Sequence, residues 1–223
     1  MADTIDAPRL GALLDQGCAR LGLELDADRR DRLLRFIALL HKWNRAYNLT
    51  AVRDPEAMIK RHLLDSLSIV PWVRGPRVLD VGAGPGLPGI VLAIFDPSLE
   101  LTLLDSNGKK VRFQRQAVLE LGLANVHPVH ERIEAFTDAH GFDQIVSRAF
   151  ASLDDFIALS RPLLGAGGEW LAMKGRREVD EERAPAGVVI RERISLAVPG
   201  EEGARHLLRL APEHHLDQQG TAS

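Results

Sequence analysis

Apolar residues in the first third of the chain recur at helical spacing. Between residues 28 and 47 they stand three or four positions apart, with charged residues on the other face: Leu33, Phe36, Ile37, Leu40 and Trp43. This spacing is typical of an amphipathic helix. A second helix is expected to begin at Asp54, an N-cap residue followed by Pro55, and to end at Pro71. The pattern predicts a helical N-terminal region over residues 1–72.

The pattern changes after residue 72, where short apolar runs alternate with helical segments. We expect strands at 77–82, 100–105, 125–130, 142–150 and 167–175, and helices at 89–96, 108–121 and 153–164. Residues 188–198 and 204–211 then alternate with period two, as an antiparallel strand pair does. Strands that alternate with helices form a parallel sheet through right-handed crossovers. We therefore expect an α/β domain over residues 73–212, with a mixed, mostly parallel seven-stranded sheet flanked by helices, and a loose tail at 213–223.

Composition and charge limit the classes of partner. The 223 residues are 45% hydrophobic and 26% charged, as in globular chains, with a net charge of -3 and a pI near 6.2. No global basic field attracts nucleic acid, so RNA binding would depend on local patches. Cys18 is the single cysteine, which excludes an internal disulfide, suits a reducing cytoplasm and predicts a small apolar filler. No apolar stretch approaches the roughly 20 residues of a membrane span, and we expect no metal site.

Residues 78–90, VLDVGAGPGLPGI, place a glycine-rich turn directly after a predicted strand. In open α/β sheets, ligands bind beyond the carboxyl ends of the strands. The dinucleotide pattern G-x-G-x-x-G is not met, because Gly82 and Gly84 fit it but Leu87 takes the third place. Pro85 and Pro88 also remove two N–H groups that a phosphate would need. A P-loop is excluded, because no Lys-Ser or Lys-Thr pair closes the segment.

Two carboxylates beside this turn favour a cationic ligand. Asp80 lies at the expected mouth of the turn, where it would repel an anion. Asp105 ends the next strand, where it can accept hydrogen bonds from both ribose hydroxyls of a nucleoside. An NAD site uses a similarly placed acid, so Asp105 does not separate the two cofactors. Asp80 and the two prolines favour S-adenosylmethionine, whose ammonium and sulfonium groups are positive.

The chain resembles the bacterial ribosomal RNA small subunit methyltransferase G family, also called glucose-inhibited division protein B. The resemblance runs in order from about residue 30 to 175, in the segments HKWNRAYNLTAVRDPEAMIKRHLLDSL, VLDVGAGPGLPGI, LLDSNGKKVRF and FDQIVSRAFASL. It implies a Rossmann-like class I methyltransferase fold and a cytoplasmic enzyme that moves a methyl group from S-adenosylmethionine to N7 of a guanine in 16S rRNA. The expected partner is 16S rRNA, the small ribosomal subunit or its assembly intermediate, with no DNA and no membrane. We expect a monomer.

The resemblance also implies which residues contact the cofactor. Carried over by position, they are Gly82, Leu87, Ile133, Glu134 and Arg148. Gly82 allows close approach of the backbone, and Leu87 can pack on the ligand. Ile133 and Glu134 follow the third strand, where the adenine is expected. Arg148 ends the fourth strand, beside the methionine end of the donor or the incoming RNA. The two carboxylates described above are added from the charge argument.

The implied chemistry needs no general base. Guanine N7 has a free lone pair and bears no proton, so we name no catalytic residue and expect alignment and preorganised dipoles to drive the reaction. A-form RNA hides N7 in a deep, narrow groove, so the target guanine must lie in an irregular or splayed segment. Cations that could bind the RNA backbone lie near the predicted strand ends: Lys42, Arg45, Arg53, Lys60, Arg61, His62, Lys109, Lys110, Arg112, Arg115, Lys174, Arg176 and Arg177.

Two residue pairs in the N-terminal region have simpler interpretations. Trp43 and Tyr47, four apart on a helix, are expected to pack in the core rather than to stack on a base. His62 and Asp65, three apart, are expected to share a structural hydrogen bond rather than to move a proton.

On the residues alone, three other functions stay open. They are an NAD-dependent oxidoreductase on the same topology, a methyltransferase with a small-molecule or protein acceptor, and a non-enzymatic RNA-binding protein that has kept an empty pocket. Tight binding of NADH would favour the first. Mapping of 7-methylguanine after incubation with a labelled donor and ribosomal RNA separates the other two from the implied activity.

Overall fold

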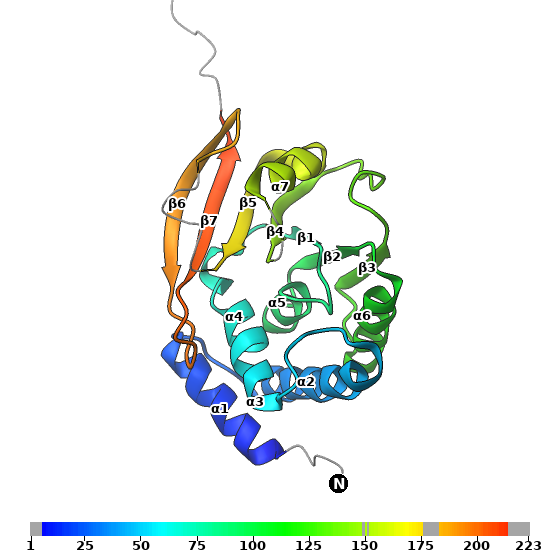
Figure 1. Cartoon of the computed structure of the whole chain (residues 1–223), viewed down its shortest axis with the longest axis vertical. Helices are drawn as coiled ribbons and strands as arrows, with labels where there is room; N and C mark the ends of the chain where they lie inside the picture. Colours follow the sequence, from blue (N-terminus) through cyan, green and yellow to red (C-terminus); the bar gives the residue numbers. More distant parts are fainter. Residues whose placement is uncertain (1–5, 149, 151, 176–182, 214–223) are drawn as a thin grey trace, which may run out of the picture.

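The computed structural model describes residues 6–148, 150, 152–175 and 183–213. Within these ranges the chain forms a seven-stranded sheet with helices on both faces (Figure 1). The strands are β1 Arg77–Val81, β2 Glu100–Asp105, β3 Val126–His130, β4 Phe142–Ser147, β5 Leu164–Lys174, β6 Val188–Leu196 and β7 Arg205–Pro212. Each predicted strand is confirmed to within a few residues of its expected bounds.

The strand order is β3-β2-β1-β4-β5-β7-β6. Strands β1 to β5 pair in parallel, whereas β7 runs antiparallel to both β5 and β6. This confirms the mixed, mostly parallel sheet that the sequence predicts. The order reverses between β1 and β4, which is the switch point where open α/β sheets bind ligands. Because β7 is antiparallel, its first residues lie beside the carboxyl end of β5, and His206 pairs with Lys174.

Helical segments make up the N-terminal region and the connections between strands. Before the sheet lie α1 Ala7–Arg20, α2 Ala27–Tyr47, α3 Pro55–Met58, η1 Ile59–Leu64, α4 Asp65–Leu67 and η2 Val70–Trp72. Between strands lie α5 Gly89–Phe95, α6 Gly108–Leu121, α7 Leu153–Ser160 and η3 Arg161–Leu163. Asp54 caps α3 as predicted, because its carboxylate accepts a hydrogen bond from the Ala57 N–H at 2.7 Å. No helix in the described ranges is long and apolar enough to cross a membrane.

The helix expected to run unbroken to Pro71 differs in the structure. Residues 59–64 form a π-helical turn, the α-helical part ends at Leu67, and Pro71 lies inside the 3₁₀ turn η2. The prediction that Pro71 ends this helix is therefore wrong. A π-helical turn contains one residue more per hydrogen-bonded ring than an α-helix, and such turns occur mostly at functional sites.

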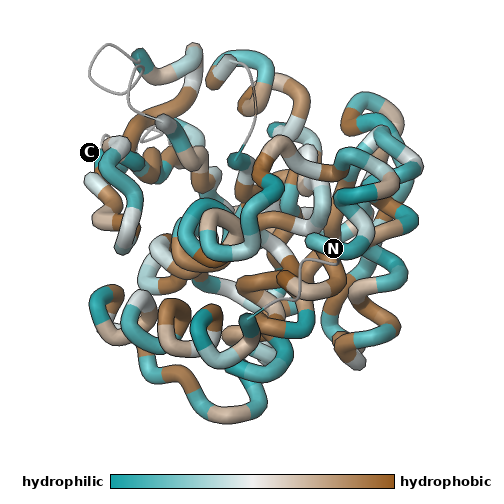
Figure 2. Tube along the Cα trace, turned by 60° about the horizontal axis from the view of Figure 1, so that its bottom comes forward, coloured by the Kyte–Doolittle hydropathy of each residue, from teal (hydrophilic) through white to brown (hydrophobic). Residues whose placement is uncertain are grey.

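Alternation along the strands divides the core between the two faces of the sheet. Val78 packs with α1, α2, η1, α5 and α6 on one face, whereas its neighbour Leu79 packs with α7 on the other. Figure 2 shows brown, apolar segments toward the interior and teal, polar segments outside. The N-terminal helices thus share one apolar core with the sheet. The predicted boundary at residue 72 falls between η2 and β1, and residues 214–223 of the predicted tail lie outside the described residues.

Candidate functional site

Glycines shape the turn between β1 and α5. Gly82, Gly84 and Gly86 have φ angles of 68°, 58° and 88°, a region that other residues rarely adopt. A Cβ on Gly86 would lie 2.4 Å from the Ile90 side chain, so this glycine lets the turn close onto α5. A Cβ on Gly82 would meet no atom within 4 Å. Gly82 therefore leaves the backbone open to the space beyond the strand, where a ligand can approach it.

Asp80 lies beneath this turn rather than at its mouth, which corrects its expected position. The residue is 0% exposed, and its Oδ2 accepts a hydrogen bond from the Gly89 N–H at 2.8 Å. The reason is the alternation of β1, because Asp80 shares the sheet face of Val78, which α5 covers. Burial raises the pKa of the Asp80 carboxyl to about 7. Asp80 therefore holds the start of α5 in place.

Asp105 ties the end of β2 to the glycine turn. One carboxylate oxygen accepts a hydrogen bond from the Gly84 N–H and the other from the Asn107 N–H, both at 2.8 Å. Gln114 supports the same turn from α6, because its side-chain amide donates to the Gly84 carbonyl at 2.8 Å. Each Asp105 oxygen keeps a second lone pair for a ligand. The residue therefore shapes the turn and can also bind what lies above it.

A cavity of about 420 Å³ opens beside the glycine turn, and we call it the glycine-turn cavity. Its wall combines the ends of β1 and β2, the segment after β3, one residue of α6, one residue between β4 and α7, and one residue of α7. The lining residues are Val81, Gly82, Leu104, Asp105, Ser106, Lys110, Glu131, Arg132, Ile133, Glu134, Phe150 and Leu159. Four of the seven predicted cofactor residues meet here, namely Gly82, Asp105, Ile133 and Glu134. Their meeting depends on the parallel sheet, which places the carboxyl ends of its strands at one edge.

The other three predicted cofactor residues lie outside this wall. Asp80 is beneath the turn, and Leu87 is 2% exposed and packs in the core with the apolar residues of α5. Arg148 follows β4 directly and lines a second cavity. Phe150, two residues further along, lines the glycine-turn cavity. The two cavities are therefore lined by residues that stand two positions apart after β4.

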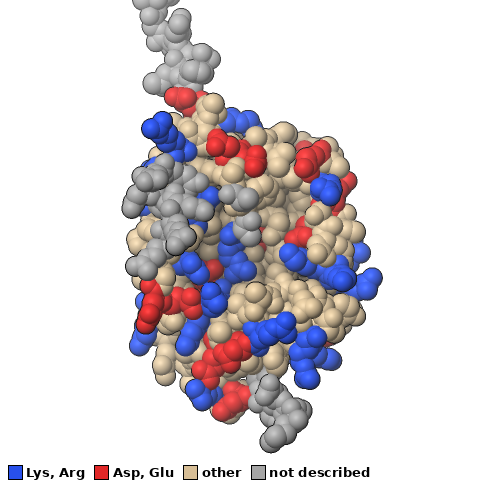
Figure 3. Space-filling view, in the orientation of Figure 1, with Lys and Arg blue, Asp and Glu red and all other residues tan. Residues whose placement is uncertain are grey.

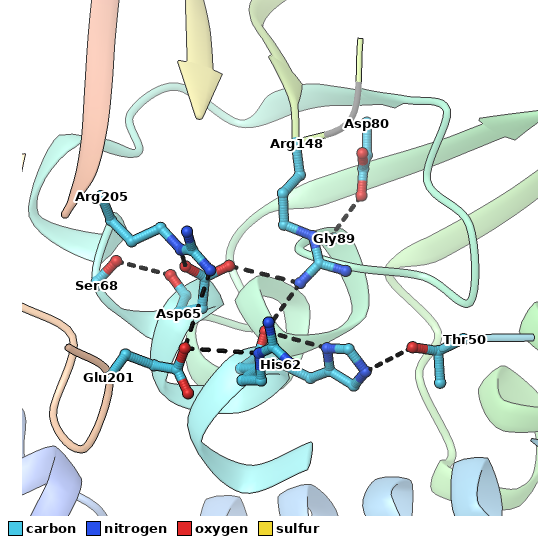
Figure 4. Close-up of polar contacts among 10 residues, drawn as sticks. Thr50, His62, Asp65, Ser68, Asp80, Gly89, Arg148, Glu201 and Arg205 are labelled. Carbon is cyan, nitrogen blue, oxygen red and sulfur yellow. Dashed lines mark hydrogen bonds and ion pairs between the residues drawn. The ribbon is translucent and has the colours of Figure 1, made fainter. Parts of the chain in front are cut away.

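The second cavity has a volume of about 330 Å³, and we call it the Asp65 cavity. Its wall brings together η1, α4, the end of β5 and the start of β7: Ala51, Val52, Arg61, His62, Asp65, Arg148, Met173, Lys174, Gly175, Leu196, Arg205 and His206. Figure 4 shows Arg148 and Arg205 approaching the Asp65 carboxylate from two sides. The distances are 3.5 Å from Arg148 Nη1 to Oδ2 and 3.3 Å from Arg205 Nε to Oδ1. Glu201 extends this network, at 3.5 Å from Arg61 and 4.0 Å from Arg205.

One carboxylate oxygen of Asp65 lacks a hydrogen bond in this network. It is 4% exposed, and burial raises the pKa of its carboxyl even though two arginines oppose that shift. Its Oδ1 makes no hydrogen bond with any described residue. The arginine contacts are long compared with the roughly 2.7–2.9 Å of good charge-assisted hydrogen bonds.

His62 does not bond to Asp65, so the predicted structural hydrogen bond between them is wrong. Its Nδ1 lies 3.0 Å from the Arg61 carbonyl, and its Nε2 lies 3.0 Å from the Thr50 hydroxyl. Because a carbonyl can only accept, Nδ1 carries the proton and Nε2 accepts from Thr50. Burial, followed by the charge of Arg148, lowers the pKa of His62 to about 4. The imidazole is therefore neutral at pH 7. The expectation that His62 serves as a cation for RNA is wrong.

Most of the cations predicted to bind RNA are exposed. These are Lys42, Arg45, Arg53, Arg61, Lys109, Arg112 and Arg115, with Lys60 and Lys110 half-buried. Figure 3, drawn in the orientation of Figure 1, shows Lys and Arg side chains gathered around a hollow in the middle of the face in view. Lys174 is buried, and Arg176 and Arg177 lie outside the described residues.

The aromatic pair on α2 has two different environments. Trp43 is half-buried, and its ring lies 5.7 Å from that of Phe113 in an edge-on contact. Tyr47 is 39% exposed, with its ring 5.2 Å from Trp43. The prediction of core packing is confirmed for Trp43 and wrong for Tyr47.

Arg205 is a site residue that sequence reasoning missed. Arg205 lies 140 positions after Asp65, so no local motif joins them. A signal did exist, because an antiparallel last strand brings its first residues to the edge where the parallel strands end. Applied to residues 204–211, that rule would have placed Arg205 near the carboxyl end of β5.

Solved structures similar to this chain are methyltransferases. A S-adenosylmethionine-dependent methyltransferase from Aquifex aeolicus aligns with a TM-score of 0.54 at 15% identity, covering 76% of this chain and 96% of that one. One from Thiobacillus denitrificans, solved with S-adenosyl-L-homocysteine, aligns with a TM-score of 0.52 at 15% identity, covering 80% and 98%. This likeness establishes the Rossmann-like methyltransferase fold.

Sequence comparison is more specific. A family model described as rRNA small subunit methyltransferase G matches residues 29–208. Proteins named ribosomal RNA small subunit methyltransferase G share 67% identity in Chromohalobacter salexigens and 55% in Methylococcus capsulatus. The first alignment covers 91% of this chain and 98% of its relative, and the second covers 90% and 98%. The chain therefore belongs to the rRNA small subunit methyltransferase G family.

Proposed function

We propose that the protein transfers the methyl group of S-adenosylmethionine to N7 of a guanine in 16S rRNA, within the small ribosomal subunit or an assembly intermediate of it. Membership of the family supports an rRNA methyltransferase. The observation that carries the proposal is the glycine-turn cavity, which opens at the switch point of the sheet and leaves open space above Gly82.

The walls of the glycine-turn cavity fit an adenosyl donor. Gly82 gives close approach of the backbone, and Ile133 offers an apolar surface for the adenine. Asp105 and Glu134 supply carboxylates that accept hydrogen bonds from ribose hydroxyls and attract positive charge. Arg148 stands at the border with the Asp65 cavity, where the reacting end of the donor and the acceptor would meet. Direct contact of Leu87 and Asp80 with the donor stays a prediction.

The reaction places few demands on the side chains. S-adenosylmethionine, when bound, supplies an electrophilic methyl group on a positively charged sulfur. Guanine N7 forms the new N–C bond with its lone pair while the C–S bond breaks, so the positive charge moves to the purine and no proton is released. The residues of this chain have to bind the donor and the acceptor, orient them and exclude water. Such positioning accounts for a large part of many enzymatic rate enhancements. A neutral His62, held by Thr50, agrees with a site that needs no general base.

Replacing Gly82 by Ala tests the cavity, with Gly122→Ala as a matched control. Both glycines are left-handed, with φ of 68° and 64°, and a Cβ on either would meet no atom within 4 Å. Each substitution should therefore cost about 1–2 kcal/mol of unfolding free energy. Only Gly82→Ala places a methyl group in the cavity, so only this variant should lose affinity for S-adenosylhomocysteine, by at least about tenfold, which corresponds to about 1.4 kcal/mol.

Calorimetry measures that affinity, and NADH is titrated in parallel. Methyl transfer from labelled donor is then followed on small subunits and on bare 16S rRNA, with 7-methylguanine mapped in the product. Equal affinity of the two variants for S-adenosylhomocysteine would refute the cavity as the donor site. Tight binding of NADH without binding of S-adenosylhomocysteine, or label at no guanine N7, would refute the proposed function.

A further inference from the structure

The buried carboxylate of Asp65 lacks a hydrogen bond from the described residues at one of its two oxygens, which lowers the stability of the folded protein. A buried carboxylate costs several kcal/mol unless short hydrogen bonds satisfy both of its oxygens. Asp65 instead makes two long arginine contacts, at 3.3 and 3.5 Å, and leaves Oδ1 without a hydrogen bond among the described residues. The residue lines a cavity that also contains donors from both arginines. Oδ1 itself is enclosed by protein, with Arg205 Nε 3.3 Å away, so a polar ligand in the cavity would reach this acceptor when Arg205 turns from Oδ1 to the ligand.

The size and position of the cavity favour a nucleobase as its ligand. Its volume of about 330 Å³ is at the lower end of the roughly 300–1,000 Å³ found for small-ligand sites. Arg148, which lines this cavity, and Phe150, which lines the glycine-turn cavity, stand two positions apart in the chain. A base in this cavity would therefore lie beside the reacting end of a donor in the glycine-turn cavity. Enzymes that act on a base commonly take it out of its stack and read its Watson–Crick edge in such a pocket.

The order of donors and acceptors in the cavity matches guanine. On its Watson–Crick edge, guanine presents two neighbouring donors, N1–H and the N2 amino group, followed by the O6 acceptor. A carboxylate can accept both donors in parallel, and an adjacent guanidinium can donate to O6. Adenine presents an acceptor at N1 and would place its lone pair against the Asp65 carboxylate, which excludes it by repulsion. N7 lies on the other edge of the purine and stays free.

We propose that the Asp65 cavity binds the acceptor guanine by its Watson–Crick edge and that Asp65 is the residue that selects guanine. In this arrangement the Asp65 carboxylate accepts from N1–H and the N2 amino group, and Arg205, 29% exposed, donates to O6. Guanine thus satisfies the carboxylate that the protein alone leaves short of hydrogen bonds. This inference rests on the proposed function, because it identifies the acceptor pocket of that reaction.

Asp65 would also stabilise the transition state. Methylation at N7 makes the purine cationic, which makes its N1–H a stronger donor. A hydrogen bond from N1–H to a carboxylate therefore strengthens as the charge develops, and it contributes to rate as well as to binding. Loss of the carboxylate should lower both kcat and the preference for guanine.

Inosine tests this role, because it lacks only the N2 amino group of guanosine. The target position is first mapped with the wild type, and 16S rRNA carrying guanosine or inosine there is reconstituted into small subunits. The wild type should prefer guanosine over inosine in kcat/KM by roughly 10- to 100-fold, the value of a hydrogen bond to a charged group. In Asp65→Asn, which keeps one acceptor and adds a donor, that preference should fall to about threefold or less.

The ratio of two substrates is independent of the folded fraction and of donor affinity, so a merely structural role of Asp65 would not change it. Glu201→Gln is the matched control, because Glu201 belongs to the same ion-pair network but does not line the cavity. This variant should keep the wild-type preference. An unchanged preference in Asp65→Asn would overturn the inference. If that variant is too slow to measure, the wild type decides, and equal use of inosine and guanosine overturns the inference. A wild type that methylates no guanine at N7 would overturn the proposed function instead.

Discussion

Replacement of Asp80 by Asn removes a charge that the fold buries completely. Desolvation raises the pKa of Asp80 to about 7, against a usual value of about 3.9, and outweighs the favourable effects of the Gly89 N–H and of Arg148. Between pH 4 and pH 7 the folded protein therefore holds a proton that the unfolded chain releases. Stability from this group is present at low pH and is lost as the pH rises. At about 1.36 kcal/mol per pH unit, and with the folded group half deprotonated at pH 7, the loss from pH 5 to pH 7 is about 2.3 kcal/mol.

The Asp80→Asn side chain is neutral at every pH, and its carbonyl oxygen can still accept from the Gly89 N–H. The unfolding free energy of the variant should lack the pH-dependent contribution of the Asp80 proton. The unfolding free energy of the variant minus that of the wild type should therefore rise by about 2–3 kcal/mol between pH 5 and pH 7. Urea unfolding at pH 5, 6 and 7, followed by circular dichroism, measures this difference. Asp31→Asn, on an α2 side chain that is 64% exposed, is the control and should show no shift. Parallel pH dependences for Asp80→Asn and wild type would refute the burial argument.

Two further predictions concern the supports of the two cavities. His62 titrates below its usual range, with a pKa of about 4. The His62 contribution to the unfolding free energy should therefore fall by about 3 kcal/mol as the pH falls from 6.5 to 4. Because Asp80 contributes in the opposite direction over this range, the quantity to measure by urea unfolding is the difference between the wild type and His62→Gln, which should change by that amount. Gln114 donates to the Gly84 carbonyl from a fully buried position. Gln114→Leu leaves that carbonyl unpaired, which should lower the unfolding free energy by about 1–3 kcal/mol. Calorimetry should then show at least about fivefold weaker binding of S-adenosylhomocysteine. Unchanged affinity would contradict a role of Gln114 in shaping the turn.

Local patterns predicted the elements of the sheet and the edge at which the glycine-turn cavity opens. Apolar runs, glycine stops and N-cap residues depend on neighbours in sequence, and this is why β1, the glycine turn and the cap at Asp54 were predicted correctly. The position of Asp80 was not, although the information was present. In a strand with period-two alternation, Asp80 must share a face with Val78, and a helix that follows the turn covers that face. Attention to the face of the sheet, as well as to the end of the strand, would have placed Asp80 beneath α5.

The Asp65 cavity was beyond prediction from local sequence for a different reason. Its partners come from segments far apart in the chain, and the geometry of η1 depends on packing. Gly17 in α1 shows this dependence, because a Cβ there would lie 2.4 Å from Leu64 Cδ1, the residue that ends η1. Helix propensity carries no information on such a contact. The sequence predicted a continuous helix where tertiary contacts produce a π-helical turn that carries His62 into the cavity wall.

If the Asp65 cavity binds the acceptor as proposed, the N-terminal helices are part of the reaction centre rather than an appendage to it. The α/β domain alone supplies the glycine-turn cavity, since its wall consists of strand ends, the segments that follow them and residues of α6 and α7. The Asp65 cavity needs both ends of the chain, because η1 and α4 contribute one wall and β5 and β7 contribute the other. On the proposed assignment, a fold shared by many methyltransferases provides the donor site, and the segment from Ala51 to Asp65 provides the features that distinguish one acceptor from another. Selectivity for the acceptor should accordingly change with substitutions in η1 and α4, whereas affinity for the donor should depend on the turn after β1.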